Sequence, residues 1–153
     1  MSENLSPVES TQHKDFFDDV PANTVFVYER SCGEALWEDV IGKKSSSYFS
    51  LPNDNWVVSK ESRKIGEWME AYNNDENKIV ADILQRELDW GFDTKVRFFG
   101  KKSVVLETSW KSFLLHWDGF LALEDDCPIL VKDGDIETGI LFTGTGDILV
   151  INN

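Results

Sequence analysis

The stretch FLALEDDCPILVKDGDIETGILFTGTGDILVI, residues 120–151, decides the fold class of this 153-residue chain. Turn segments rich in Gly, Asp and Pro divide it at intervals of about ten residues. Between them lie four short apolar runs, Phe120–Leu123, Ile129–Val131, Ile140–Phe142 and Ile148–Ile151. Short apolar runs bounded by such residues are typical of strands joined by tight turns. The pattern therefore predicts an antiparallel meander in the last quarter of the chain.

The segment before this meander predicts a hairpin followed by a helix. Val96–Phe99 and Val104–Glu107 are apolar runs that flank a short Gly-Lys-Lys connection, as in a β-hairpin. Thr108 or Ser109 can then cap a helix. Gly119 suits the end of that helix. Its apolar face has the spacing i, i+3, i+4 and i+7 and consists of Trp110, Phe113, Leu114 and Trp117.

Between Ser62 and Leu88 the apolar residues follow a helical period. The first stripe consists of Ile65, Trp68, Met69 and Tyr72, and Asn73–Asn74 interrupts it. The second consists of Ile79, Val80, Ile83, Leu84 and Leu88. We expect a helical hairpin here. The fold class is therefore α+β, with a helical hairpin and a short third helix packed on a mainly antiparallel sheet.

The beginning of the chain has a different texture. Residues 1–23 are polar, contain two prolines and lack sustained periodicity, so we expect a flexible N-terminal lead-in. Thr24–Glu29 is rich in β-branched and aromatic residues and predicts a first strand. Ala35–Ile41 predicts a short helix. Residues 24–153 are expected to form a single α+β domain, because this length supports one core.

Composition excludes several functional classes. Hydrophobic residues make up 41% of the chain, so a packed core is expected in spite of a net charge of −13. The acidic balance argues against a nucleic-acid partner, which requires clustered Lys and Arg, and against a basic membrane-binding face. The chain shows neither a secretory signal nor an apolar run of the ~20 residues that span a membrane. Cys32 and Cys127 are too few for a disulfide framework, and we expect a cytoplasmic protein.

The negative charge is distributed unevenly. Residues 24–117 carry a net charge of −2, whereas residues 1–23 carry −4 and residues 118–153 carry −7. Such a surface either attracts a basic partner by steering or serves solubility alone, and both interpretations stay open. In the first case Trp90 or Trp117 would supply an exposed aromatic anchor. The acidic partner-binding residues would be Glu124, Asp125, Asp126, Asp133, Asp135, Glu137 and Asp147.

No catalytic motif is apparent. His13 lies in the predicted lead-in, and His116 lies beside the apolar face of the third helix, where a boundary position is expected. TGTGD lacks the Gly-Lys-Ser/Thr ending of a phosphate loop and indicates a hairpin turn instead. Asp133–Glu137 has alternating acids, but its glycine comes too early for a calcium loop. We expect no catalytic residues, no metal site and no cofactor.

The stretch Thr108–Asn153 resembles the C-terminal part of small acidic immunity proteins, which bacteria encode beside polymorphic or contact-dependent toxins. The resemblance rests on three features: spaced aromatics from Trp110 to Phe120, the acidic bend Glu124–Asp126 before Pro128, and a final strand pair around Gly144–Gly146. It covers about the last third of the chain. It implies a cytoplasmic protein that binds and neutralises a toxin domain.

These observations lead to one hypothesis and two alternatives. The hypothesis is an acidic binding protein, not an enzyme, that neutralises a basic protein partner such as the C-terminal domain of a bacterial toxin, possibly a nuclease. The first alternative is a small carboxylate- or metal-dependent enzyme with an unrecognised site. The second is a scaffold that self-associates through an edge of its sheet.

Overall fold

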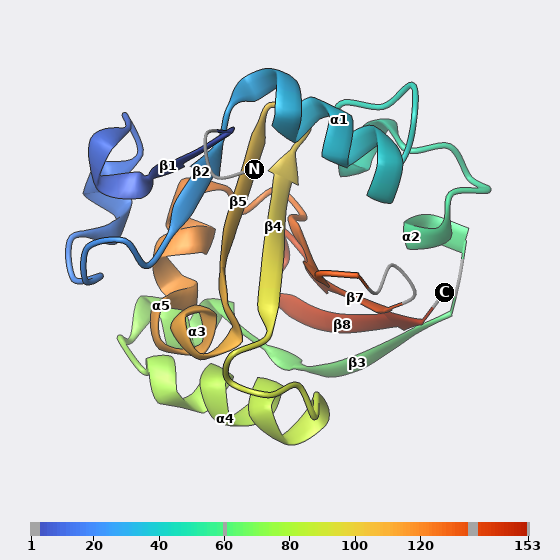
Figure 1. Ribbon diagram of the computed structural model, residues 1–153. Helices are drawn as coiled ribbons and strands as arrows, with labels where there is room; N and C mark the ends of the chain where they lie inside the picture. The colour runs from blue at the N-terminus through green and yellow to red at the C-terminus, as the bar shows by residue number, and fades with distance from the viewer. Residues whose placement is uncertain (1–3, 60, 135–137, 153) are drawn as a thin grey trace.

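The computed structural model describes residues 4–59, 61–134 and 138–152, and its strands form an eight-stranded antiparallel sheet (Figure 1). Their order across the sheet is β1-β2-β5-β4-β6-β7-β8-β3. In chain order the strands are β1 (Leu5–Pro7), β2 (Phe26–Tyr28), β3 (Ser62–Glu67), β4 (Lys95–Lys101), β5 (Val104–Ser109), β6 (Ile129–Lys132), β7 (Thr138–Phe142) and β8 (Asp147–Asn152).

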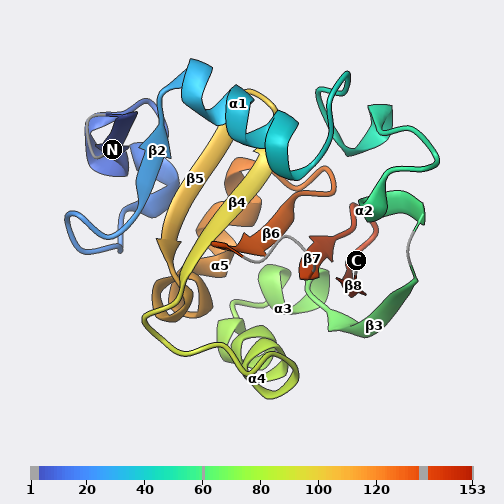
Figure 2. The same cartoon turned by 45° about the vertical axis from the view of Figure 1, so that its right-hand side comes forward.

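The helices cover both faces of this sheet. They are α1 (Arg30–Val40), α2 (Trp56–Ser59), α3 (Met69–Asn73), α4 (Asn77–Glu87) and α5 (Trp110–Leu123), with 3-10 turns η2 (Val8–Ser10), η3 (Lys14–Phe17) and η4 (Tyr48–Ser50). In Figures 1 and 2, α1 crosses one face near the end of β4 and β5, while α5 lies behind the sheet. None of the described helices is long and apolar enough to cross a membrane.

Side-chain alternation along the strands produces two hydrophobic cores, one on each face. On β4, Phe98 belongs to the core that contains α5 and α4, whereas Phe99 belongs to the core that contains α1. Strand residues one apart point to opposite faces, so each central strand supplies both cores. The predicted helical face of α5 is confirmed, because Trp110, Phe113 and Trp117 are all fully buried.

Several predicted elements are confirmed. β4 and β5 form the expected hairpin, β6, β7 and β8 form an antiparallel meander, and α1 and β2 occupy the expected places. Ser109 caps α5 by accepting a hydrogen bond from the backbone N–H of Ser112. The α+β class is therefore confirmed, although the sheet dominates the fold.

The helical hairpin predicted for Ser62–Leu88 does not form as expected. Its first half begins with a strand, β3, that pairs with β8 at the edge of the sheet, and α3 follows it for only five residues. Long-range hydrogen bonds favour the strand over a helix here. The backbone N–H of Trp68 donates to Gly146 O, and the indole Nε1 of Trp68 donates to Thr143 O at 3.0 Å. A bulge between Lys64 and Gly66 and charged side chains mark β3 as a protected edge, which disfavours self-association there.

The predicted end of the third helix is also wrong. α5 continues past Gly119 to Leu123, with a distorted residue at His116 (φ −129°, ψ 21°), so the run Phe120–Leu123 is helix and not strand. Gly119 serves close packing instead of termination. A Cβ at this position would lie 2.5 Å from the backbone oxygen of Phe16.

The N-terminal segment packs against the domain, in contrast to the flexible lead-in that we expected. β1 pairs with β2, and the side chains of Val8 and Phe17 are buried in the core on the α5 side. The Phe17 ring contacts the Phe120 ring edge to face, with 4.9 Å between the centroids. Residues 4–23 therefore contribute a strand and buried side chains to the domain that we predicted to begin at residue 24.

Candidate functional site

The acidic C-terminal residues divide between two ends of the sheet. Glu124–Asp126 precedes β6, and the β7–β8 turn approaches it closely, because a Cβ at Gly144 would lie 3.9 Å from Asp125 O. These two segments therefore share one end of the sheet. Asp133 follows β6 at the opposite end, where its N–H donates to Lys95 O. Asp135 and Glu137 lie outside the described residues.

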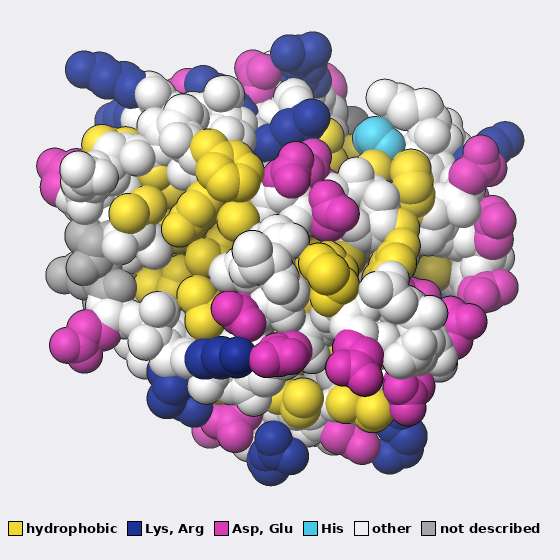
Figure 3. Space-filling view, turned by 180° about the vertical axis from the view of Figure 1, so that it is seen from behind, with side chains coloured by type: hydrophobic (Ala, Val, Ile, Leu, Met, Phe, Trp, Pro, Cys, Tyr) yellow, Lys and Arg dark blue, Asp and Glu magenta, His cyan; other side chains and the backbone are white. Residues whose placement is uncertain are grey.

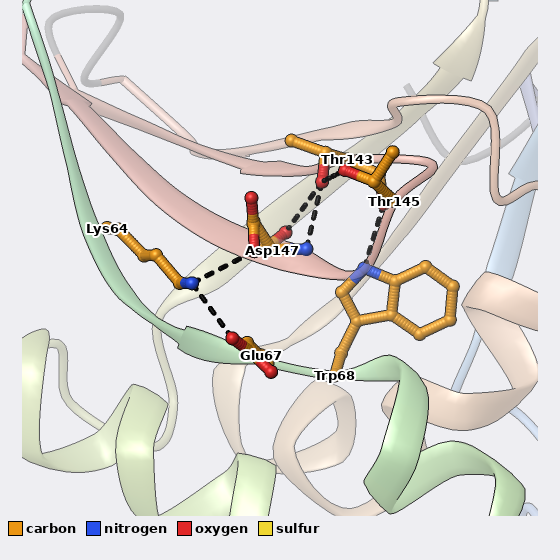
Figure 4. A network of polar contacts seen from close by, with 6 residues as sticks. All are labelled: Lys64, Glu67, Trp68, Thr143, Thr145 and Asp147. Atoms are coloured by element: carbon orange, nitrogen blue, oxygen red, sulfur yellow. Dashed lines mark hydrogen bonds and ion pairs between the residues drawn. The ribbon is translucent and has the colours of Figure 1, made fainter.

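Basic side chains neutralise much of this acidic surface. Lys101 Nζ lies 3.6 Å from Glu124 Oε1, and Arg97 Nη1 lies 2.8 Å from Asp133 Oδ1. Figure 4 shows that Lys64 bridges Glu67 and Asp147 beside the β7–β8 turn. Of the predicted acidic binding residues that the structure describes, Asp125 and Asp126 alone form no ion pair with a described residue.

The carboxylates of Glu124, Asp125 and Asp126 lie within 4.8 Å of one another, which is a spacing compatible with a metal ion. Oxygen ligands of this kind suit Ca²⁺ or Mg²⁺. However, Asp125 and Asp126 are exposed, and Lys101 already competes for Glu124. Exposed acidic turns commonly show such spacing, so we assign no metal to this group.

The two candidate aromatic anchors lie in different surroundings. Trp117 is fully buried and its Nε1 donates to Asn77 O at 2.9 Å, so it cannot serve as an exposed anchor, and that prediction is wrong. Trp90 is half-buried against Trp110, with 4.9 Å between the ring centroids. Three further aromatic side chains are exposed and were not predicted from the sequence as anchors: Phe16, Phe49 and Phe92.

A second acidic surface lies where the N-terminal segment meets α5. A hollow of about 200 Å³ is lined by residues 15–20 and by residues 116, 118 and 119. We call it the acidic hollow, because its walls carry the carboxylates of Asp15, Asp18, Asp19 and Asp118. Figure 3 views the molecule from behind and shows acidic side chains along the side that carries the N-terminal segment.

The carboxylates of the acidic hollow lack basic partners within the part of the chain that the structure describes. None of the four forms an ion pair with a described Lys or Arg, although Lys14 is adjacent in sequence. Phe16 lines the same hollow with 42% of its surface exposed. Burial lowers the pKa of His116, and the charges of Asp118 and Asp19 partly oppose that effect. The imidazole therefore favours its neutral form in this hollow.

The acidic hollow depends on the burial of one phenylalanine and on one glycine. Phe17 is inserted into the core beside Phe120, which leaves the neighbouring Phe16 on the surface. Gly119 allows the backbone of Phe16 to approach α5. The sequence contains a weak signal for this arrangement, since an acidic lead-in with two adjacent phenylalanines can turn one of them inward.

A different polar group occupies the open part of the sheet on the α1 side. Arg97 on β4 lies opposite Glu107 on β5, and Glu107 is only 7% exposed. Tyr28 donates a short hydrogen bond to Glu107 Oε1 and accepts one from Arg97 Nε at 3.0 Å. We call Tyr28, Arg97, Glu107 and Asp133 the sheet cluster. Each buried charge in it has a partner, as burial requires.

The sheet cluster is poorly suited to acid–base chemistry. Burial, assisted by the hydrogen bond to Glu107, raises the pKa of Tyr28 to about 12. The phenol therefore stays protonated at neutral pH and acts as a hydrogen-bond donor, not as a base or nucleophile.

The other candidate reactive side chains also lack an activating partner. Within the described part of the chain, the imidazoles of His13 and His116 make no hydrogen bond to a Ser, Thr or Cys side chain. Cys32 and Cys127 are free thiols. Cys127 is buried, and burial raises the pKa of its thiol, which disfavours the reactive thiolate form.

The comparisons with known proteins yield a family without an assigned activity. Neither a search of curated proteins nor a search of solved structures found a match. A family model described as "Protein of unknown function (DUF2947)" matches residues 12–150, which include the acidic hollow and the sheet cluster. The chain therefore belongs to the DUF2947 family.

Proposed function

We propose that this protein binds and neutralises a basic protein partner through the acidic hollow, and that the partner is a bacterial toxin domain. The carrying observation is the group of four carboxylates around the hollow, none of which pairs with a described basic residue. The resemblance of the last third of the chain to immunity proteins supports the same class of function. The proposed class of function is therefore the one expected from the sequence. The proposed binding surface, however, is the acidic hollow and not the C-terminal turns.

Electrostatics favours the acidic hollow over the C-terminal turns. Three carboxylates of the C-terminal turns already have a basic neighbour: Glu124 pairs with Lys101, Asp147 with Lys64 and Asp133 with Arg97. These ion pairs would have to break before a basic partner could bind the carboxylates. Asp18 and Asp19 need no such exchange. Uncompensated charges of one sign steer an oppositely charged partner and raise the association rate by about 10–10³-fold at low salt.

The hollow also supplies an apolar contact. Phe16 lies among the carboxylates and is partly exposed, so a basic partner can bury this ring while its Lys or Arg side chains meet the acids. Arg is particularly suited to this combination, because its guanidinium stacks on aromatic rings and binds carboxylates in a bidentate manner. Phe16 thereby takes the role of anchor that we expected of a tryptophan.

The alternative of a small enzyme receives less support. Tyr28 in the sheet cluster is held protonated, and the imidazoles described above have no hydroxyl or thiol to activate. A binding protein needs none of these arrangements.

Paired charge reversals test the proposal. The binding partner would be the basic domain encoded beside this gene, or the protein captured by pull-down from the native host. We expect Asp18→Lys/Asp19→Lys to lower the association rate constant by about tenfold or more at low salt, with a flatter salt dependence. Surface plasmon resonance over a salt series measures both quantities.

The matched control is Asp125→Lys/Asp126→Lys, which makes the same change of charge on the C-terminal surface. We expect this variant to lose less than about fivefold, the effect of an exposed ion pair worth up to about 1 kcal/mol. Equal losses in the two variants would assign binding to net charge instead of the acidic hollow. A larger loss in the control would return the site to the C-terminal turns.

A further inference from the structure

We propose that a cavity beside the sheet cluster binds a small ligand that carries both an ammonium and a carboxylate group, the chemistry of a free amino acid. The cavity has a volume of about 340 Å³ and lies between β2, β5 and the first turn of α5. Figure 2 shows that α1 leaves this part of the sheet uncovered. The lining residues are Asn23, Thr24, Phe26, Asp93, Lys95, Glu107, Thr108, Ser109 and Ser112.

Lys95 is the group that would bind the ligand carboxylate. Its Nζ lies 3.9 Å from Glu107 Oε2, which is too long for a hydrogen bond, and it has no closer acidic partner among the described residues. The first turn of α5 cannot take this role. Its N–H groups at Trp110, Lys111 and Ser112 already donate to Thr94 O, Phe92 O and Ser109 Oγ.

Glu107 and Asp93 are the groups that would bind the ligand ammonium. Tyr28 occupies Glu107 Oε1, whereas Oε2 has only the long contact to Lys95 in spite of the residue's burial. Because Oε2 accepts no hydrogen bond from a described residue, it remains free to accept a charge-assisted hydrogen bond from an ammonium group. Asp93 lines the same cavity and pairs with no described base.

A purely structural role accounts for only part of this arrangement. The bonds among Tyr28, Arg97 and Asp133 explain why Glu107 can be buried. They leave Lys95 with only the 3.9 Å contact to Glu107 Oε2, and Asp93 without an ion-pair partner among the described residues. A ligand with only a negative charge or only a positive charge would leave one of the two signs of charge on the cavity wall without a partner. A zwitterion can pair with both.

The size and the apolar wall limit the ligand further. Ligand pockets in proteins span roughly 300–1,000 Å³, so this cavity accepts a single small molecule at the lower end of that range. Phe26 is half-buried and offers a ring against which an apolar ligand side chain can pack. The preferred ligand class is thus an amino acid with an uncharged side chain. This inference is independent of the acidic hollow and of a protein partner.

Isothermal titration calorimetry with glycine, L-leucine, L-phenylalanine, L-glutamate and L-lysine tests the inference on the full chain. We expect binding to be strongest for leucine or phenylalanine. N-acetyl-leucine lacks the ammonium group and leucinamide lacks the carboxylate, so each should bind at least tenfold more weakly than leucine. Absence of binding by all five amino acids at millimolar concentration would overturn the inference, as would equal affinity for leucine and its two derivatives.

Variants then locate the site. Lys95→Met and Asp93→Asn should each weaken leucine binding about tenfold, and Glu107→Gln should do so while still accepting the hydrogen bond from Tyr28. Lys78→Met is the matched control, because Lys78 is exposed on α4 outside the cavity. Circular dichroism verifies that each variant is folded, and the exposed Lys95 and Asp93 keep the test valid if Glu107→Gln unfolds. Unchanged affinity in Lys95→Met would place any amino acid binding elsewhere.

Discussion

The acidic C-terminal turns and the acidic hollow carry the same type of side chain but differ in their surroundings. In the turns, Glu124, Asp133 and Asp147 each lie beside a Lys or Arg. In the hollow, Asp18 and its neighbours face one another, His116 and Phe16. The turns therefore use their charge to hold the sheet and its loops together, whereas the hollow leaves its charge available to a partner.

This difference shows why net charge per segment is an incomplete guide to a binding surface. The C-terminal third has the larger excess of acids, but the bases that neutralise it come from β3 and β4, far away in sequence. The N-terminal segment has fewer acids, yet it joins Asp118 on α5 at a surface where the acids form no ion pair with a described Lys or Arg. Only the tertiary arrangement distinguishes the two cases.

The largest expected effect concerns Phe17, the buried ring that holds the N-terminal segment against α5. Phe17→Ala should lower the free energy of unfolding by about 3–5 kcal/mol, because it removes a buried ring that packs on Phe120. Urea denaturation followed by tryptophan fluorescence measures the change. The control is Phe49→Ala, whose ring is 68% exposed and which should cost about 0.5 kcal/mol or less. Similar small losses in both variants would mean that the N-terminal segment is not part of the core.

The next effect concerns the packing of that segment on α5. In a free helix, Gly119→Ala would gain about 1 kcal/mol from helix propensity. Here the new Cβ would lie 2.5 Å from Phe16 O, and such overpacking costs about 1–3 kcal/mol. A backbone oxygen cannot rotate away as a side chain can, so we expect a net loss of stability.

Gly144→Ala is the matched control for this substitution in the C-terminal turns. Its Cβ would have Asp125 O as its nearest neighbour, at 3.9 Å, so we expect little change. Thermal unfolding of both variants, followed by circular dichroism, measures the difference. An increase in melting temperature for Gly119→Ala would indicate that Phe16 and the N-terminal segment move away from α5 easily.

The sequence predicted the parts of the fold that depend on local patterns. The hairpin of β4 and β5, the last three strands and the buried face of α5 follow from apolar runs, turn residues and the helical period. Each of these signals lies within about fifteen residues, so no distant partner was needed to interpret it.

The errors arose where a distant partner decides the structure. Ile65, Trp68 and Tyr72 have helical spacing, but pairing of β3 with β8 and the bond from Trp68 to Thr143 impose a strand first. Gly119 was interpreted as a helix end, although its role is to admit the backbone of Phe16. The acidic hollow could not be predicted for the same reason, since its two walls are about a hundred residues apart in sequence.

A smaller pair of effects with opposite signs distinguishes the two acidic regions directly. Asp133→Asn removes the ion pair with half-buried Arg97 and should lower the free energy of unfolding by about 0.5–1 kcal/mol. Asp18→Asn removes one of several like charges around the hollow and should raise stability slightly. Urea midpoints at low ionic strength measure both, and high salt should diminish both. Destabilisation by Asp18→Asn would reveal a stabilising role for that carboxylate.

The smallest expected effect is the pH dependence that the acidic hollow confers. Burial holds the pKa of His116 below its ordinary value of 6.5 in the folded state, so the unfolded chain binds the proton more readily. Stability should therefore decrease as the pH falls below about 6.5, and level off once the folded imidazole is protonated. The same direction holds for His13, whose pKa burial also lowers.

His13→Asn/His116→Asn should therefore flatten the dependence of the urea midpoint on pH between 7.5 and 5.5, a range above the titration of ordinary carboxylates. Asp118→Asn should steepen it, because the charge of Asp118 raises the pKa of His116 and so opposes the effect of burial. The two variants thus change the pH profile in opposite directions. A profile that stays equally steep without both histidines would assign the dependence to acids, and an Asp118→Asn profile like that of the native chain would separate His116 from the carboxylates of the hollow.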